Sequence, residues 1–235
     1  MQTVLITGSN RGLGYEFTAQ YLEQGARAIA CCRQPKTANK LQLLKTKYDR
    51  QLTIVPLDVS KESSIIEAFK LIKNNFNSID LLINNAGIGL RKTLDNFTFE
   101  DLTNIFLINA AAPLIVSRTF LPLLMAGNRP IIANITSQLG SITLQQSEFT
   151  GIGSFDYNPS KAALNMISVM LASSLKNKGI IVLTQSPGWA STDLGGSNAP
   201  NSPEEVVSGM IKIFNSISLQ DTGKYYEWTG KELPW

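Results

Sequence analysis

Short apolar runs rich in β-branched residues alternate with stretches of helical spacing along the whole chain. Such alternation is typical of parallel strands joined by crossover helices that cover both faces of a sheet. We therefore predict the α/β class, with one doubly wound domain over residues 1–235 and a mostly parallel seven-stranded sheet flanked by helices. The predicted strands are 3–7, 27–32, 52–59, 79–87, 130–137, 179–188 and 224–228, and the predicted helices are 11–25, 36–49, 60–76, 99–125, 157–178 and 202–217.

Two prolines modify this pattern. Pro56 cannot donate a ladder hydrogen bond, so it places the third strand at a sheet edge or itself near the strand's end. Pro113 lies inside the helical stretch 99–125 and is expected to bend it.

Composition and charge exclude several classes of function. The chain has 2 cysteines, the adjacent Cys31 and Cys32, and no histidine, so we expect neither a disulfide framework nor a metal site. The net charge is +3 and the basic residues are scattered, which argues against a nucleic-acid partner. No apolar run approaches the roughly 20 residues of a membrane span, and the first residues lack secretory features. We expect a cytoplasmic protein without a membrane partner.

A glycine-rich turn follows the first predicted strand and opens a helix. Glycine permits a tight turn and a close backbone approach, so a pyrophosphate can lie at the helix N-terminus. The spacing differs from the commoner G-x-G-x-x-G, and a plain tight turn is the alternative. The predicted cofactor-binding residues of this turn are Gly8, Ser9, Asn10, Arg11, Gly12, Leu13 and Gly14.

The second predicted strand ends without the acid that usually holds the ribose 2′-hydroxyl of NAD. Cys31, Cys32 and Arg33 occupy that place. An acid repels a 2′-phosphate, whereas Arg33 binds one, and Arg11 can approach the same phosphate. The hypothesis is an NADP cofactor. The alternative is that Arg33 is a solvated charge at the strand end.

Polar or small residues also end the third and fourth predicted strands. Asp58 and Val59 are predicted to contact the adenine, although Asp58 can equally cap a helix. Asn85, Ala86 and Gly87 are predicted to lie against a bound nucleotide, with a simple turn as the alternative.

A tyrosine and a lysine stand four residues apart at the start of a predicted helix. Tyr157 and Lys161 share a helix face, and Ser137 follows the fifth strand. Free tyrosine has a pKa near 10, and a nearby positive charge lowers it. Reaching about 7 takes about 4 kcal/mol, which a lysine and an oxidised nicotinamide can supply in a partly dry site. Such a pair permits proton transfer without histidine, although one Tyr-x-x-x-Lys pair arises easily by chance.

Taken together and in this order, these motifs resemble the short-chain dehydrogenase/reductase family, which has a Rossmann fold. The resemblance covers essentially the whole chain. "GSNRGLG" (8–14), "PGWASTDLGG" (187–196) and "TGKYYEWTGKELPW" (222–235) are similar to one branch, the NADP-dependent carbonyl reductases like sniffer and the C-factor protein.

The resemblance implies a role for each matching residue. Tyr157 exchanges the proton of the substrate oxygen, Lys161 lowers the pKa of Tyr157 and holds the nicotinamide ribose, and Ser137 hydrogen-bonds the substrate carbonyl. Asn109 matches the helix residue that supports a proton-relay water. The cofactor-binding residues that the resemblance implies also include Tyr157 and Lys161 and, on the nicotinamide side, Pro187, Gly188, Trp189 and Thr192.

The expected function is NADPH-dependent reduction of an aldehyde, ketone or quinone to an alcohol, with the small-molecule carbonyl compound as partner and residues at about 190–204 as the substrate loop. Two alternatives stay open. One is a 3-oxoacyl, sugar or steroid dehydrogenase on the same machinery, and the other is a nucleotide-binding signalling protein of the C-factor type with little turnover. The family tendency implies a homodimer or homotetramer.

Overall fold

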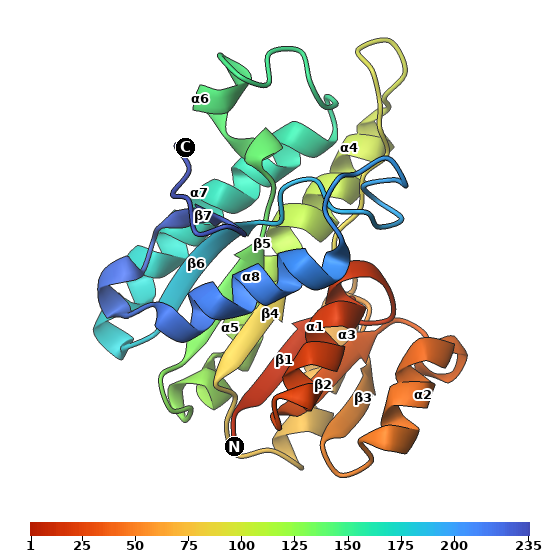
Figure 1. Cartoon of the computed structure of the whole chain (residues 1–235), viewed down its shortest axis with the longest axis vertical. Coiled ribbons are helices and arrows are strands. Elements are labelled where there is room, and N and C mark those ends of the chain that lie inside the picture. The colour runs from red at the N-terminus through yellow and green to blue at the C-terminus, as the bar shows by residue number, and fades with distance from the viewer.

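The computed structural model describes residues 1–235 and contains one sheet of seven strands with helices on both faces (Figure 1). The strands are β1 (Thr3–Thr7), β2 (Arg27–Cys32), β3 (Leu52–Pro56), β4 (Leu81–Asn84), β5 (Ile131–Ile135), β6 (Ile181–Ser186) and β7 (Tyr225–Glu227). Their order is β3-β2-β1-β4-β5-β6-β7, and every neighbouring pair is parallel. The predicted fold class is confirmed, and the sheet is wholly rather than mostly parallel.

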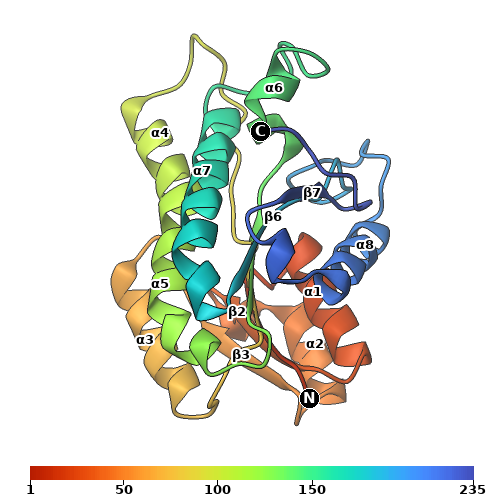
Figure 2. The same cartoon turned by 90° about the vertical axis from the view of Figure 1, so that its left-hand side faces the viewer.

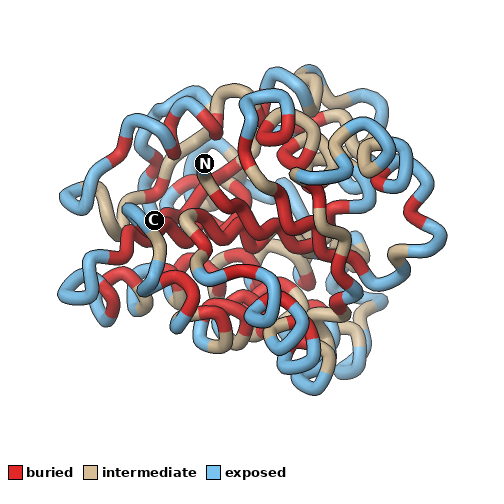
Figure 3. The backbone as a smooth tube through the Cα atoms, turned by 90° about the horizontal axis from the view of Figure 1, so that it is seen from below, coloured by how far each residue is buried: buried red, intermediate tan, exposed pale blue.

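The helices are α1 (Gly12–Glu23), α2 (Asn39–Lys47), α3 (Glu62–Lys73), α4 (Phe99–Phe106), α5 (Ala112–Met125), α6 (Ile142–Gln145), α7 (Tyr157–Leu175) and α8 (Pro203–Ser216). One face of the sheet is covered by α1, α2 and α8, and the other by α3, α5 and α7 (Figure 2). The strands between them are almost continuously buried (Figure 3). Burial on both faces explains why the strands read as unbroken apolar runs.

The two prolines act near the predicted places. β3 is an edge strand and ends at Pro56, as expected from the missing donor. The long helical stretch is interrupted by a π-helical turn, Leu107–Ala111, which ends two residues before Pro113. The N–H of Ala112 bonds the carbonyl of Leu107, and Pro113 offers no N–H to the turn behind it.

Several element boundaries differ from the prediction. α3 begins at Glu62 rather than at residue 60, because Ser60 donates to the Asp58 carboxylate within the preceding turn. The predicted strand 79–87 is observed only over Leu81–Asn84. The residues beyond it form a loop, and this pattern of strand followed by polar loop recurs along the same sheet edge.

The helical stretch Phe99–Met125 is the one stretch long and apolar enough, by length and composition alone, to cross a membrane. Half of its most apolar window is buried inside the protein. Core helices of water-soluble proteins pass the same test, and α5 packs against the sheet in this way.

The order in which successive strands are added to the sheet reverses between β1 and β4. From β1 the chain runs outward through β2 to β3 and then returns to β4 on the other side of β1. In parallel sheets, ligands bind beyond the carboxyl ends of the strands at such a reversal. The turn after β1 and the loop after β4 therefore lie side by side where a ligand is expected.

Candidate active site

The glycine turn after β1 is closed by the loop after β4. A methyl group at Gly14 would lie 2.3 Å from the Gly8 carbonyl oxygen and 2.5 Å from Asn85 Nδ2. Gly8 has φ +68, and a methyl group there would lie 3.0 Å from Ala86 Cα. Only glycine fits these two positions without displacing the backbone. Ser9 is buried and donates its hydroxyl to the Ile6 carbonyl, so its side chain faces the strand rather than the turn.

The remaining turn residues differ in exposure. Asn10 and Arg11 are exposed, and Leu13 packs against the core on the α1 side. Gly12 has φ +53, and a methyl group there would lie 3.5 Å from Thr192. The turn therefore presents its backbone and two exposed polar side chains at the sheet edge.

Thr7, at the end of β1, ties the two loops together, and sequence reasoning missed it. Its hydroxyl accepts hydrogen bonds from the backbone N–H groups of Asn85 and Ala86, both at 3.0 Å. Asn85 Nδ2 donates back to the Thr7 carbonyl at 2.9 Å. The only feature of the sequence that could have indicated this role is a hydroxyl on the last residue of a buried strand. The predicted Asn85, Ala86 and Gly87 thus lie directly beside the glycine turn.

Arg33 and Asp58 come together at the ends of β2 and β3. Arg33 is exposed and forms no ion pair, so its guanidinium is available. Burial favours the neutral form of Asp58, but hydrogen bonds from Ser60 and the charges of Lys61 and Arg33 hold the pKa of the carboxyl below its usual value. Asp58 orders the turn before α3, and Val59 is half-buried beside it.

Arg11 pairs with Asp193. Arg11 Nη1 and Asp193 Oδ2 are 3.0 Å apart, and both side chains are mostly exposed. The exposed pair links the glycine turn to the segment after β6 and contributes little stability by itself.

The segment after β6 folds back toward the glycine turn. Gly188 has φ +63, and its N–H donates to the Ser186 hydroxyl next to Pro187. Trp189 is half exposed and donates its indole N–H to the Gly195 carbonyl, while Thr192 accepts from the N–H of Gly195. The predicted nicotinamide-side residues therefore lie on one compact turn. Among them, Thr192 is the residue that lies next to Gly12 of the glycine turn.

Tyr157 and Lys161 occupy the first turns of α7, one helical turn apart. Lys161 is buried, and its Nζ lies 5.5 Å from the centre of the Tyr157 ring. The ammonium donates to the Ile135 carbonyl at 2.9 Å, at the end of β5. Ser137 is buried just beyond β5. The structure brings the predicted serine, tyrosine and lysine together.

Asn109 lies at the π-helical turn and reaches the same cluster. Its carboxamide bonds both backbone groups of Ile88, at 2.9 Å and 2.8 Å, and donates to the Ser160 hydroxyl at 3.0 Å. A methyl group placed on Gly87 would lie 3.2 Å from Asn109 Oδ1 and 3.5 Å from Lys161 Nζ. Asn109 and Lys161 therefore converge on Gly87, which has no side chain to separate them.

Tyr225, in β7, supports Ser137 and was not predicted. Its buried hydroxyl donates to the Ser137 carbonyl at 2.6 Å, and its ring stacks on Trp235 with the centres 5.1 Å apart. The Ser137 hydroxyl in turn accepts from the N–H of Leu139. "KYYEW" appeared in the sequence only as an edge strand, with nothing to connect Tyr225 to a serine so distant in the chain.

Burial controls the protonation of the two titratable groups. It raises the pKa of Tyr157 to about 12, with the Ser137 hydroxyl acting in the opposite direction. Burial also lowers the pKa of Lys161 to about 8. The expected lowering of the Tyr157 pKa is therefore not found in the protein alone, because burial of the phenol favours its neutral form. A phenol with this pKa keeps its proton at neutral pH and has one to donate.

Comparison with known proteins agrees with this arrangement. The profile of the short chain dehydrogenase family matches residues 2–202. The chain belongs to the short-chain dehydrogenase/reductase family. Its type is that of sniffer and the carbonyl reductases, which confirms the resemblance inferred from the motifs.

Two solved structures and one relative illustrate the similarity. The NADPH-bound carbonyl reductase from chicken fatty liver superposes with a TM-score of 0.94 at 35% identity, covering 100% of this chain and 99% of the other. The carbonyl reductase Sniffer of Drosophila melanogaster gives a TM-score of 0.93 at 26% identity, with 100% of both chains covered. The C-signal protein of Myxococcus xanthus is 35% identical over 158 residues, 67% of this chain and 93% of the relative.

Proposed function

We propose that this oxidoreductase reduces the carbonyl group of an aldehyde, ketone or quinone at the expense of NADPH. The observation that carries the proposal is the convergence of Ser137, Tyr157, Lys161 and Asn109 beside the glycine turn. The carbonyl reductases among its structural neighbours support the same class of reaction.

The residues at the sheet edge fit a nicotinamide dinucleotide. Gly8 and Gly14 leave a cradle that a methyl group would fill, and α1 directs its free N–H groups toward it. The free guanidinium of Arg33, with no carboxylate at the end of β2, fits a 2′-phosphate and favours NADP over NAD. When bound, the reduced nicotinamide supplies the hydride.

The chain itself supplies orientation and the proton. Ser137 and Tyr157 offer hydroxyl groups that can hydrogen-bond one substrate oxygen, which polarises the carbonyl. Tyr157 then donates its proton as negative charge develops on that oxygen. The buried Lys161 ammonium, 5.5 Å from the centre of the ring, stabilises the tyrosinate that remains. Asn109 holds the start of α7 and the Ile88 backbone in register with these groups.

A signalling protein with little turnover is the second candidate, favoured by the similarity to C-signal. Nucleotide binding alone does not require the Tyr157 hydroxyl. A Tyr157→Phe protein that retains its full signalling activity in the cell would favour this second candidate over the reductase.

The first test follows NADPH oxidation by the purified protein with quinones, aromatic aldehydes and diketones. We expect Tyr157→Phe to lower turnover by about 10²–10⁴-fold, because the proton donor is lost. The dissociation constant of NADPH should stay unchanged, since the ring remains. A wild-type protein that binds NADPH but turns over no carbonyl compound would overturn the proposal.

The cofactor preference is tested on Arg33. Arg33→Ala should weaken NADPH binding by about 10–100-fold and leave NADH binding unaffected. Arg50→Ala, an exposed arginine ahead of β3, serves as the matched control. Equal losses for the two nucleotides would exclude an NADP-selective role for Arg33.

We also propose a cytoplasmic homodimer or homotetramer. The two buried cysteines are both free, as in a reducing compartment. Helix α7 packs beside α5 (Figure 2). Its exposed apolar side chains Met166, Val169 and Met170 would be covered by a second copy of this chain. Sedimentation as a single 25.7 kDa species would exclude oligomerisation.

A further inference from the structure

Asp156 is a buried carboxylate to which the proposed reaction assigns no role. Its exposed fraction is 0%, and it directly precedes Tyr157. Carboxylates are seldom fully buried unless they are paired, yet none of the ion pairs of the chain includes Asp156. It occupies the N-cap position of α7 but makes no capping hydrogen bond to that helix. Its buried charge must be compensated elsewhere.

The compensation comes from the loop after β4. The N–H of Leu90 donates to one carboxylate oxygen and the N–H of Lys92 to the other, both at 2.9 Å. The N–H of Phe155 returns a hydrogen bond to the Lys92 carbonyl at 3.3 Å. Burial favours the neutral acid, but these N–H groups and the Ser154 hydroxyl hold the pKa of Asp156 below its usual value. The ionised carboxylate therefore clamps the loop.

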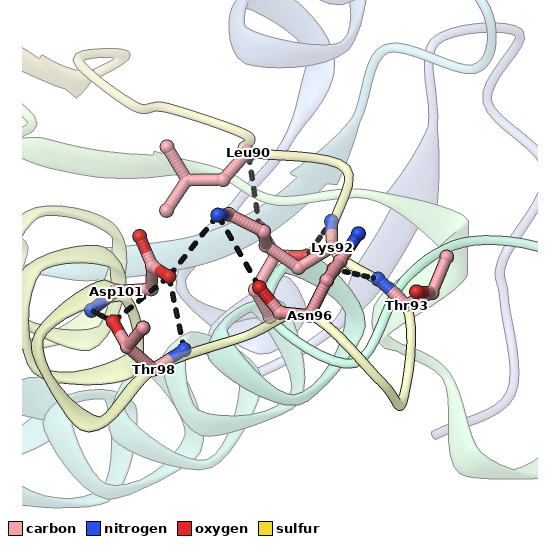
Figure 4. Close-up of polar contacts among 7 residues, drawn as sticks. Leu90, Lys92, Thr93, Asn96, Thr98 and Asp101 are labelled. Carbon is pink, nitrogen blue, oxygen red and sulfur yellow. Dashed lines mark hydrogen bonds and ion pairs between the residues drawn. The ribbon is translucent and has the colours of Figure 1, made fainter.

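The side chain of Lys92 takes no part in this clamp. Its ammonium lies 3.2 Å from the Asp101 carboxylate, which also accepts hydrogen bonds from the N–H and the hydroxyl of Thr98 (Figure 4). The outer part of the loop is thus fixed separately, by Thr93, Asn96, Thr98 and Asp101. Within the inner part, residues 88–92, Asp156 holds Leu90 and Lys92 through their backbone N–H groups, and Asn109 holds the backbone of Ile88.

Residues 88–92 form one wall beside the Tyr157 ring. A methyl group at Gly89 would lie 3.4 Å from Tyr157 Cδ2 and 3.0 Å from Leu194 Cδ1. Arg91 donates from Nη2 to the Leu194 carbonyl at 2.8 Å and has φ +57. A non-glycine residue keeps that backbone conformation only where its surroundings impose it. The clamp on Leu90 and Lys92 imposes it from both sides.

We propose that Asp156 is a positioning residue that holds residues 88–92 against Tyr157 and thereby sets the width of the substrate site. It acts through the loop and touches neither cofactor nor reacting atoms. Loss of the carboxylate releases the loop and widens the space between Tyr157 and Leu194. The inference rests on the proposed reductase function, because it concerns which carbonyl compounds reach the Tyr157 hydroxyl.

The test compares Asp156→Asn and Asp156→Ala with Asp95→Asn, an exposed carboxylate in the same loop. Asn keeps the size of the side chain but can accept from only one of the two N–H groups in the same geometry. The first readout is amide hydrogen exchange of Leu90 and Lys92. The second is the ratio of kcat/KM for a bulky substrate, phenanthrenequinone, to that for a small one, diacetyl.

We expect exchange at both amides to accelerate about tenfold or more in the two Asp156 variants, as the loss of a charge-assisted hydrogen bond implies. The substrate ratio should shift at least about fivefold toward the bulky quinone, mainly through KM, with the NADPH dissociation constant within about twofold of wild type. Asp95→Asn should change none of these.

Unchanged amide exchange, or faster exchange with an unchanged substrate ratio, would overturn the inference while the wild-type reductase activity stands. A wild-type protein that reduces neither substrate nor any other carbonyl would instead remove the proposed function on which the inference rests. If Asp156→Ala does not fold, Asp156→Asn decides the question alone.

Discussion

The glycine turn after β1 and the catalytic cluster at the start of α7 share one sheet edge but are built in opposite ways. The turn depends on atoms that are missing, since Gly8 and Gly14 leave no room for a methyl group. The cluster depends on atoms that are present, since Asn109, Lys161 and Ser137 are buried and hydrogen-bonded. The glycine turn should therefore lose stability and NADPH binding when atoms are added, and the catalytic cluster should lose stability and turnover when atoms are removed.

Adding one methyl group to the turn gives the largest expected effect. Gly14→Ala places Cβ against the backbone carbonyl oxygen of Gly8 and against Asn85 Nδ2, a side-chain group held by the Thr7 carbonyl. We expect a loss of about 3 kcal/mol in the free energy of unfolding, measured by urea denaturation. The NADPH dissociation constant should rise at least about tenfold, because the cradle is displaced.

Gly25→Ala is the control for the turn. Gly25 follows α1, has φ +81 and has nothing within 4 Å of an added methyl group. It should lose only about 1 kcal/mol through backbone strain and leave NADPH binding intact. A Gly14→Ala protein no less stable than Gly25→Ala would contradict the steric account of the turn.

The catalytic cluster should show itself in the pH dependence of stability. The pKa of Lys161 is lowered to about 8 in the folded protein from 10.5. Between these values the unfolded chain holds a proton that the folded chain has lost, so the folded state gains stability as pH rises. Below pH 8 both states are protonated and the folded state carries the constant cost of a buried ammonium.

Lys161→Met isolates this effect by keeping most of the side chain and removing the charge. Between pH 8 and 9.5 the wild-type free energy of unfolding should rise by about 2 kcal/mol relative to the variant, at about 1.4 kcal/mol per pH unit. Burial raises the pKa values of Cys31 and Cys32, so these thiols make the free energy of unfolding fall as pH rises. This contribution is the same in both proteins and cancels in the comparison. Parallel profiles for the two proteins would show that Lys161 is not desolvated.

The same contrast explains what the sequence could and could not predict. Alternating apolar runs and glycine spacing are local patterns, so the parallel sheet and the turn over residues 8–14 followed from them. Tyr157 and Lys161 are one helical turn apart and were visible for the same reason. Thr7, Asp156 and Tyr225 act on backbone groups 78, 66 and 88 residues away, and no local pattern encodes such pairings.

The lowered pKa expected for Tyr157, which also relied on an oxidised nicotinamide, is not found in the protein alone, for a related reason. The sequence supplied the charge of Lys161 but neither the burial of the phenol nor the Ile135 carbonyl that takes up the ammonium. Desolvation is a property of the packed site, and composition does not reveal it.

The smallest effect is expected one step away from the cluster, at Tyr225. Tyr225→Phe keeps the stack on Trp235 but removes the donor to the buried Ser137 carbonyl. Leaving that acceptor unpaired should cost about 1 kcal/mol of stability. Turnover should fall less than about tenfold, because the N–H of Leu139 still holds the Ser137 hydroxyl. Tyr226→Phe, on the same strand and half-buried, should alter neither quantity. If Tyr225→Phe were as stable and active as Tyr226→Phe, Ser137 would be held without β7, and the catalytic region would be less sensitive to removed atoms than its hydrogen bonds imply.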